Sequence, residues 1–151
     1  MTYGRYMTAH KARNALIYVQ DDDCLISDVE MLYNRFLSLP EGILCGATPE
    51  RMAFEAEHQE IPRIALVGWG TFFRKADIDV FYRYRDKHGV DDILLREADR
   101  IFTYLQPVPA IVIPATVEHL DAVGGPALSA EVNHVASRDE AIERCQKLLG
   151  L

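Results

Sequence analysis

The residues best suited to chemistry are three consecutive carboxylates, Asp21, Asp22 and Asp23, which directly follow an apolar run at 14–20. The branched and aromatic residues of that run predict a buried strand. Ligands of open α/β sheets bind outside the carboxyl ends of the strands, so the carboxylates fall where a site is expected. Asp21 and Asp22 could hold Mg²⁺, which prefers carboxylate oxygens and keeps several waters. The alternative is a solvated, charged turn.

A second candidate is the loop Gly68-Trp69-Gly70-Thr71, with Arg74 and Lys75 close by in the sequence. Backbone amides of such a loop can bind an anion. The third glycine of a dinucleotide fingerprint is missing, however, which favours a tight turn with Trp69 packed on a neighbouring loop. No histidine lies beside Cys24 or Cys45 in the sequence, so these cysteines are interpreted as buried thiols and not as nucleophiles.

The elements that would position these residues alternate along the chain. Apolar runs predict strands at 14–20, 43–47, 63–67, 110–113 and 132–136, and amphipathic or capped segments predict helices between them. This alternation favours a parallel sheet with helices on both faces. Five strands suggest the doubly wound, flavodoxin-like order 2-1-3-4-5, with a helical insert at about 71–107. Residues 1–13 are interpreted as a leader and residues 14–151 as a single α/β domain.

Composition narrows the classes of function. The 151 residues carry a formal net charge of −7, with a pI near 5.2. This charge argues against nucleic-acid binding and against docking on anionic lipid. No apolar run approaches the roughly 20 residues that span a bilayer, and residues 1–13 lack the apolar core of a secretory signal. Three cysteines without metal-ligand spacing favour reduced thiols in the cytoplasm.

Three stretches together resemble a response-regulator receiver domain: the strand end 19–26, the run 48–67, and the strand with its flanks at 109–116. Thr116 stands where receivers carry a switch hydroxyl. Where receivers carry the phosphoacceptor aspartate after the third strand, this chain has Gly68 and Trp69, and neither can act as the carboxylate nucleophile. The resemblance therefore implies a pseudo-receiver, a signalling or assembly module that acts by binding a protein partner.

The predicted insert is rich in aromatic residues with arginines beside them, a composition typical of interface centres. We expect an interface here, with a homodimer as one form of it, or else a cover for one face of the sheet. The aromatic residues are Phe72, Phe73, Phe81, Tyr82 and Tyr84.

Two functions are consistent with the sequence. The favoured one is a non-catalytic module for protein–protein interaction, with no catalytic residue assigned. The alternative is a protein or Mg²⁺-dependent enzyme that binds a nucleotide or another phosphorylated ligand through Asp21, Asp22 and the loop 68–71. Because the chain lacks the carboxylate nucleophile of receivers, the sequence favours the module for protein–protein interaction.

Overall fold

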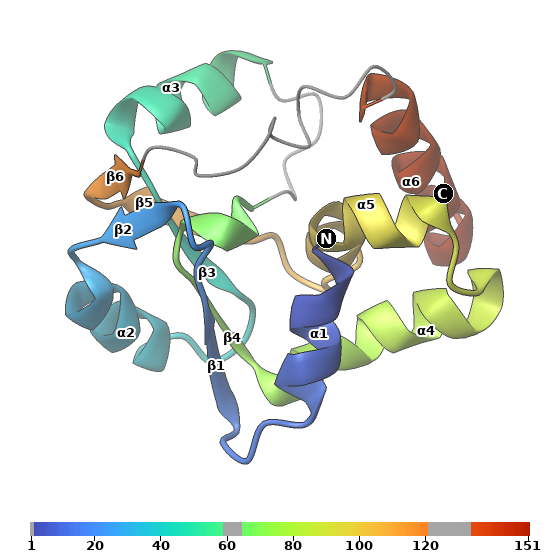
Figure 1. The fold of residues 1–151 in the computed structure, drawn as a ribbon, viewed down its shortest axis with the longest axis horizontal. Coiled ribbons are helices and arrows are strands. Elements are labelled where there is room, and N and C mark those ends of the chain that lie inside the picture. Colours follow the sequence, from blue (N-terminus) through green and yellow to red (C-terminus); the bar gives the residue numbers. More distant parts are fainter. Residues whose placement is uncertain (1, 59–64, 121–133) are drawn as a thin grey trace.

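The structure is a computed structural model that describes residues 2–58, 65–120 and 134–151 (Figure 1). Its elements in chain order are α1 (Tyr3–His10), β1 (Leu16–Val19), β2 (Cys24–Ile26), α2 (Val29–Leu37), β3 (Leu44–Ala47), α3 (Pro49–His58), the 3₁₀ helix η1 (Val67–Trp69), β4 (Thr71–Arg74), the 3₁₀ helix η2 (Lys75–Ile78), α4 (Asp79–His88), α5 (Asp92–Tyr104), β5 (Ile111–Pro114), β6 (Val117–His119) and α6 (His134–Leu149).

The main sheet has four strands in the order β1-β4-β3-β5, and β2 pairs with β6 in a separate two-stranded sheet. Only β3 and β5 are parallel. β4 is antiparallel to both of its neighbours, and β2 is antiparallel to β6. The prediction of a five-stranded, parallel, flavodoxin-like sheet in the order 2-1-3-4-5 was therefore wrong. The chain does combine helices and strands, as the alternating pattern predicted.

The error arises at the end of the predicted third strand. Val67–Trp69 forms a 3₁₀ helix, and Gly70 follows with φ of +83°, a left-handed conformation that glycine adopts at little cost. The chain turns there, and Thr71–Arg74 enters the sheet as β4 between β1 and β3. The interpretation of 71–107 as a helical insert missed this central strand. Residues 59–64, which hold part of the predicted third strand, lie outside the described residues.

The strands predicted at 14–20, 43–47 and 110–113 are confirmed as β1, β3 and β5. Residues 132 and 133 of the strand predicted at 132–136 lie outside the described residues. Residues 134–136 are helical, because α6 begins at His134. Within the segment interpreted as a leader, Tyr3–His10 forms helix α1, and the Tyr6 side chain is fully buried.

Hydrophobic clusters cover both faces of the main sheet. On one face Ile17 and Phe73 join side chains from α1, α4, α5 and α6. On the other, Phe72 packs against Leu32 and Phe36 of α2. Figure 1 shows the same layers, with α2 on one side of the strands and α1, α4, α5 and α6 on the other. The sheet is thus sandwiched between helices, and the end of β1 that leads into Asp21–Asp23 lies beside the β2–β6 pair.

Candidate functional site

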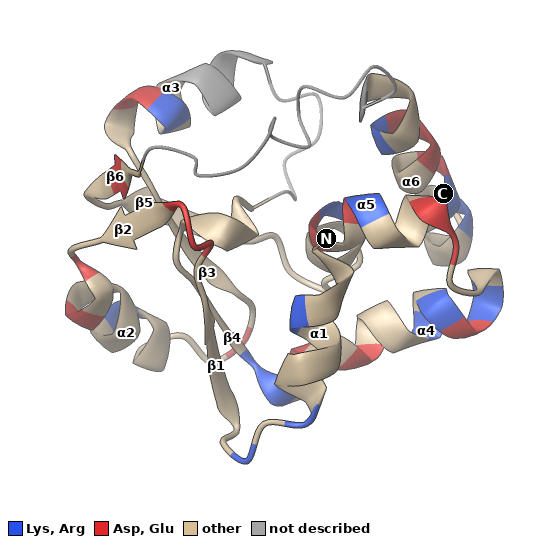
Figure 2. Ribbon diagram, in the orientation of Figure 1, with Lys and Arg blue, Asp and Glu red and all other residues tan. Residues whose placement is uncertain are grey.

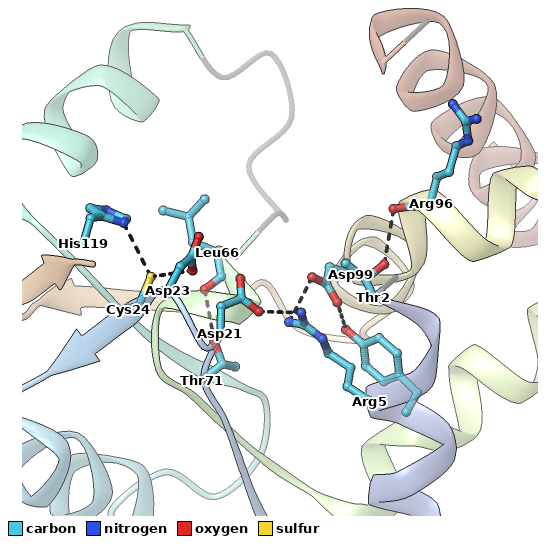
Figure 3. A network of polar contacts seen from close by, with 11 residues as sticks. Thr2, Arg5, Asp21, Asp23, Cys24, Leu66, Thr71, Arg96, Asp99 and His119 are labelled. Atoms are coloured by element: carbon cyan, nitrogen blue, oxygen red, sulfur yellow. Dashed lines mark hydrogen bonds and ion pairs between the residues drawn. The ribbon is translucent and has the colours of Figure 1, made fainter. Parts of the chain in front are cut away.

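A network of polar contacts connects the end of β1 with α1 and α5 (Figure 3). The Arg5 guanidinium lies 2.5 Å from Oδ1 of Asp21 and 3.2 Å from Oδ2 of Asp99. The Tyr6 hydroxyl donates a hydrogen bond to Oδ1 of Asp99 at 2.7 Å. We call Arg5, Tyr6, Asp21 and Asp99 the strand-end network. It holds α1 against α5 and gives one of the three adjacent carboxylates a cationic partner.

The strand-end network carries more negative than positive charge. Burial raises the pKa of Asp99 to about 6, although Arg5 and the Tyr6 hydroxyl lower it; Asp21 and Glu97 raise it further. Burial, reinforced by the Asp99 carboxylate, also raises the pKa of Tyr6 well above 10. Arg5 is thus a single cation shared by two carboxylates, and Asp99 is the group most readily neutralised by a proton.

We expect the contribution of Asp99 to the free energy of unfolding to fall as the pH rises from about 4 to 6, because Asp99 holds its proton in the folded state up to about pH 6 but loses it near 3.9 when unfolded. Asp99→Asn should remove this contribution, so the stability difference between native and variant should change across that window. Urea unfolding at each pH measures it. A difference that stays constant from pH 4 to 6 would contradict the raised pKa.

The predicted anion loop lies next to the carboxylates, but Asp21 fills it. The Asp21 amide donates to the Gly68 carbonyl at 2.8 Å, and a Cβ added to Gly68 would lie 1.8 Å from Oδ2 of Asp21. Thr71 is fully buried, and its hydroxyl donates to the Leu66 carbonyl at 3.3 Å. The glycine at position 68 therefore makes room for a carboxylate of the chain itself.

Thr116, the predicted switch hydroxyl, lies elsewhere. Its backbone amide donates to a carboxylate oxygen of Asp28 at 2.6 Å, and its carbonyl accepts from the Ser27 amide at 3.2 Å. These bonds anchor the start of α2, and the hydrogen bond from Thr116 lowers the pKa of Asp28. Thr116 is thus tied to α2 and not to the carboxylates at the end of β1.

The predicted Mg²⁺ ligands do not converge. Asp21 is paired with Arg5, whereas Asp22 is exposed. Within 2–58, 65–120 and 134–151, no three histidine, cysteine or acidic side chains are placed to hold a metal ion. What the arrangement provides is an ion pair that fixes α1 on the strand end.

The structure brings together a cysteine and a histidine that sequence reasoning did not connect. Sγ of Cys24 lies 3.5 Å from Nδ1 of His119, and its thiol donates to the Asp23 carboxylate at 3.4 Å. The Trp69 ring contacts the His119 ring edge-on, with centroids 4.6 Å apart. β2 and β6 position the pair, and strands of three residues are too short to recognise from a pattern.

This pair is poorly suited to thiolate chemistry. Burial raises the pKa of Cys24 to about 12, and the hydrogen bond and charge of Asp23 act in the same direction. A nucleophilic cysteine needs an electropositive setting that lowers its pKa. Cys24 is 2% exposed and surrounded by carboxylates, so it is a buried, neutral thiol in the core around β2.

The aromatic residues expected at an interface are mostly core residues. Phe73, Phe81 and Tyr84 are fully buried, and Phe72 is 5% exposed; Tyr82 alone of the five is partly exposed. They pack on side chains of other elements, as in the Tyr6–Phe81 stack at 4.7 Å and the Phe73–Phe102 contact at 5.0 Å. Their placement agrees with the other alternative considered for them, in which the rings cover the sheet and do not form an interface.

Four apolar side chains of β2 and α2 are exposed. Leu25, Met31, Tyr33 and Leu37 are 39–51% exposed and lie within thirteen consecutive residues, 25–37. A shallow depression of about 470 Å³ adjoins Met31. Its lining comes from the start and outer face of α2: Ser27, Asp28, Glu30, Met31 and Asn34. We call these residues together with Leu25, Tyr33 and Leu37 the α2–β2 surface.

No helix in the described ranges is long and apolar enough to cross a membrane. No protein-family model matches this chain, and searches of curated proteins and of solved structures likewise found no match, so the function has to be argued from the α2–β2 surface and the strand-end network themselves.

Proposed function

We propose that this chain is a non-catalytic domain that binds a protein partner through the α2–β2 surface. The observation that carries the proposal is the concentration of half-exposed apolar side chains on one short segment, since single exposed apolar residues are ordinary but gathered ones mark interaction sites. Leu32 and Phe36 are the buried residues of α2. Its other large apolar side chains Met31, Tyr33 and Leu37 are exposed.

Charge indicates the chemistry of the partner. Acidic residues belong to the α2–β2 surface or lie on the segments next to it: Asp28 and Glu30 at the start of α2, Asp22 and Asp23 before β2, and Glu118 on β6. Figure 2 shows them in red before β2, at the start of α2 and on β6. Complementary potentials speed association and suppress wrong partners. We therefore expect a protein segment that presents apolar anchors flanked by lysine or arginine.

The small-molecule alternative has less support. Its two proposed parts, Asp21 and the Gly68 loop, fill each other's space, and Arg5 neutralises Asp21. The overall acidity also disfavours phosphorylated ligands and nucleic acids. The three cysteines are free thiols, as is usual for cytoplasmic proteins, and we place the domain in that compartment.

A photo-crosslinking amino acid at position 31 identifies the partner, and affinity measurements with the purified partner then test the surface. Met31→Asp and Leu37→Asp should each weaken binding by about tenfold or more, because a charge replaces an apolar contact that binding desolvates. The matched control is Leu149→Asp on α6, since Leu149 is 40% exposed and Met31 is 43% exposed.

The control should bind like the native chain, and circular dichroism should show that all three variants are folded. Equal affinities for Met31→Asp, Leu37→Asp and Leu149→Asp would refute the α2–β2 surface as the binding site. So would a partner that crosslinks equally well from position 149.

A further inference from the structure

Strand β1 forms an open edge of the main sheet among the described strands, since it pairs only with β4. The Lys75 amide donates to the Ala15 carbonyl at 2.8 Å. Because antiparallel pairs alternate between hydrogen-bonded and open positions, Ile17 and Val19 direct their backbone groups to β4. Leu16 and Tyr18 direct theirs to the open edge. Figure 1 draws no described element in front of β1.

The other edge of the same sheet is protected, and β1 is not. β5 ends in Pro114 and is preceded by Pro109, and proline blocks strand pairing because it has no amide proton. β1 reads Leu-Ile-Tyr-Val, without proline, glycine or charge. Both faces of this strand are covered by core side chains, with Ile17 on one face and Leu16 and Tyr18 on the other. Among the described residues, the outward backbone groups of Leu16 and Tyr18 have no strand partner.

We infer that β1 pairs with β1 of a second copy of this chain, antiparallel about a twofold axis. The charges at the two ends of the strand identify the occupant. Exposed Lys11 and Arg13 precede β1, and exposed Asp22 and Asp23 follow it. Figure 2 shows the basic residues at one end of β1 and the acidic residues at the other.

Antiparallel pairing brings the basic end of one copy to the acidic end of the other, at both ends of the contact. In the register that pairs Leu16 with Tyr18 of the second copy, the outward backbone groups of both residues are satisfied. Arg13 then lies across from the acidic run 21–23 of the second copy. A parallel arrangement would set like charges side by side. The contact uses the backbone edge of β1 and not the apolar side chains of the α2–β2 surface.

Sedimentation equilibrium tests the pairing. A four-residue edge predicts a weak dimer, with a dissociation constant on the order of 10–100 µM. Arg13→Glu should raise this constant by about tenfold or more, because the twofold axis places a repulsive contact at each end. Adding Asp22→Arg to that variant should restore pairing to within about threefold, since opposite charges face each other again. Arg35→Glu on α2 changes the net charge equally and should leave the dimer intact.

Amide hydrogen exchange provides a readout that needs no variant. Raising the protein concentration should slow exchange at Leu16 and Tyr18 but not at Ile17 and Val19, which β4 already protects. A chain that stays monomeric up to about 1 mM overturns the inference. A dimer insensitive to Arg13→Glu, a double variant that does not recover, or unchanged exchange at Leu16 and Tyr18 also overturns it.

Discussion

The free energy of unfolding will fall steeply as the pH rises from about 9 to 11. Burial raises the pKa of Cys24 and of Cys145 to about 12 and that of Cys45 to about 11. All three side chains are at most 2% exposed. In the unfolded chain the same thiols ionise near 8.5. The folded state therefore keeps protons that the unfolded state has lost.

This difference in bound protons decides whether the free energy of unfolding rises or falls with pH. Stability is fully present below about pH 8 and declines above the unfolded pKa, because the unfolded state binds fewer protons. Each thiol contributes about 1.4 kcal/mol per pH unit, so three thiols give a slope of about 4 kcal/mol per pH unit. Domains of this size are stable by only about 5–15 kcal/mol. A slope of this size is large compared with that margin, so alkaline pH should destabilise the chain strongly.

Urea unfolding between pH 7 and 10.5 under reducing conditions measures the slope. Cys145→Ala serves as the internal comparison, since it removes one buried thiol and should reduce the slope by about a third. A stability that stays level between pH 9 and 10.5 would show that the thiols ionise normally in the folded state, and an equal slope in the variant would show this for Cys145.

Local signals predicted local structure well. The capped segments that predicted helices show their caps in the structure: the Asp91 carboxylate accepts from the Leu94 amide at 3.0 Å at the start of α5. The Thr48 hydroxyl accepts from the Arg51 amide at 3.2 Å at the start of α3. In α6, Ala141 and Cys145 lie four positions apart and are buried, whereas Leu149 is 40% exposed. Caps and periodicity depend on residues three or four positions apart, which a sequence displays directly.

Sheet topology was not predictable in the same way. Thr71–Arg74 is a strand of only four residues, and the segment that follows it in the sequence has helical signals. The direction of this strand is set by the turn at Gly70. β2 and β6 have three residues each. Alternation over so few positions carries little information. Strand order also depends on contacts between distant residues, such as Ile17 with Phe73.

The candidate site was predicted in part. The alternative function placed Asp21, Asp22 and the loop 68–71 in one site, and the Asp21 amide does donate a hydrogen bond to the Gly68 carbonyl. The strand that follows this loop, β4, is antiparallel to β1 and not parallel to it. The partner of Asp21 was missed because residues 1–13 were interpreted as a leader. Helix α1, which carries Arg5, is short and contains Gly4, so its stability comes from packing of Tyr6 and not from its own propensity.

Gly68→Ala should destabilise the chain, because the position faces the Asp21 carboxylate. The new Cβ would lie 1.8 Å from Oδ2 and 2.3 Å from Cγ of Asp21. The Asp21 backbone is held by its bond to the Gly68 carbonyl, so its side chain has to rotate away and leave Arg5. Overpacking together with a lost ion pair should cost about 2–4 kcal/mol. Gly4→Ala is the matched control, because nothing lies within 4 Å of its Cβ; it should stabilise α1 by up to about 1 kcal/mol.

A double-mutant cycle separates the clash with Asp21 from any other effect of the added methyl group. In an Asp21→Ala background the obstructing carboxylate is gone, so Gly68→Ala should cost less than about 1 kcal/mol. The coupling between the two positions should then be about 1–3 kcal/mol, measured by urea unfolding of the native chain, the two single variants and the double variant. Additive costs would mean that Gly68 is required for its backbone alone. A large coupling would establish that this glycine keeps space for the carboxylate that pairs with Arg5.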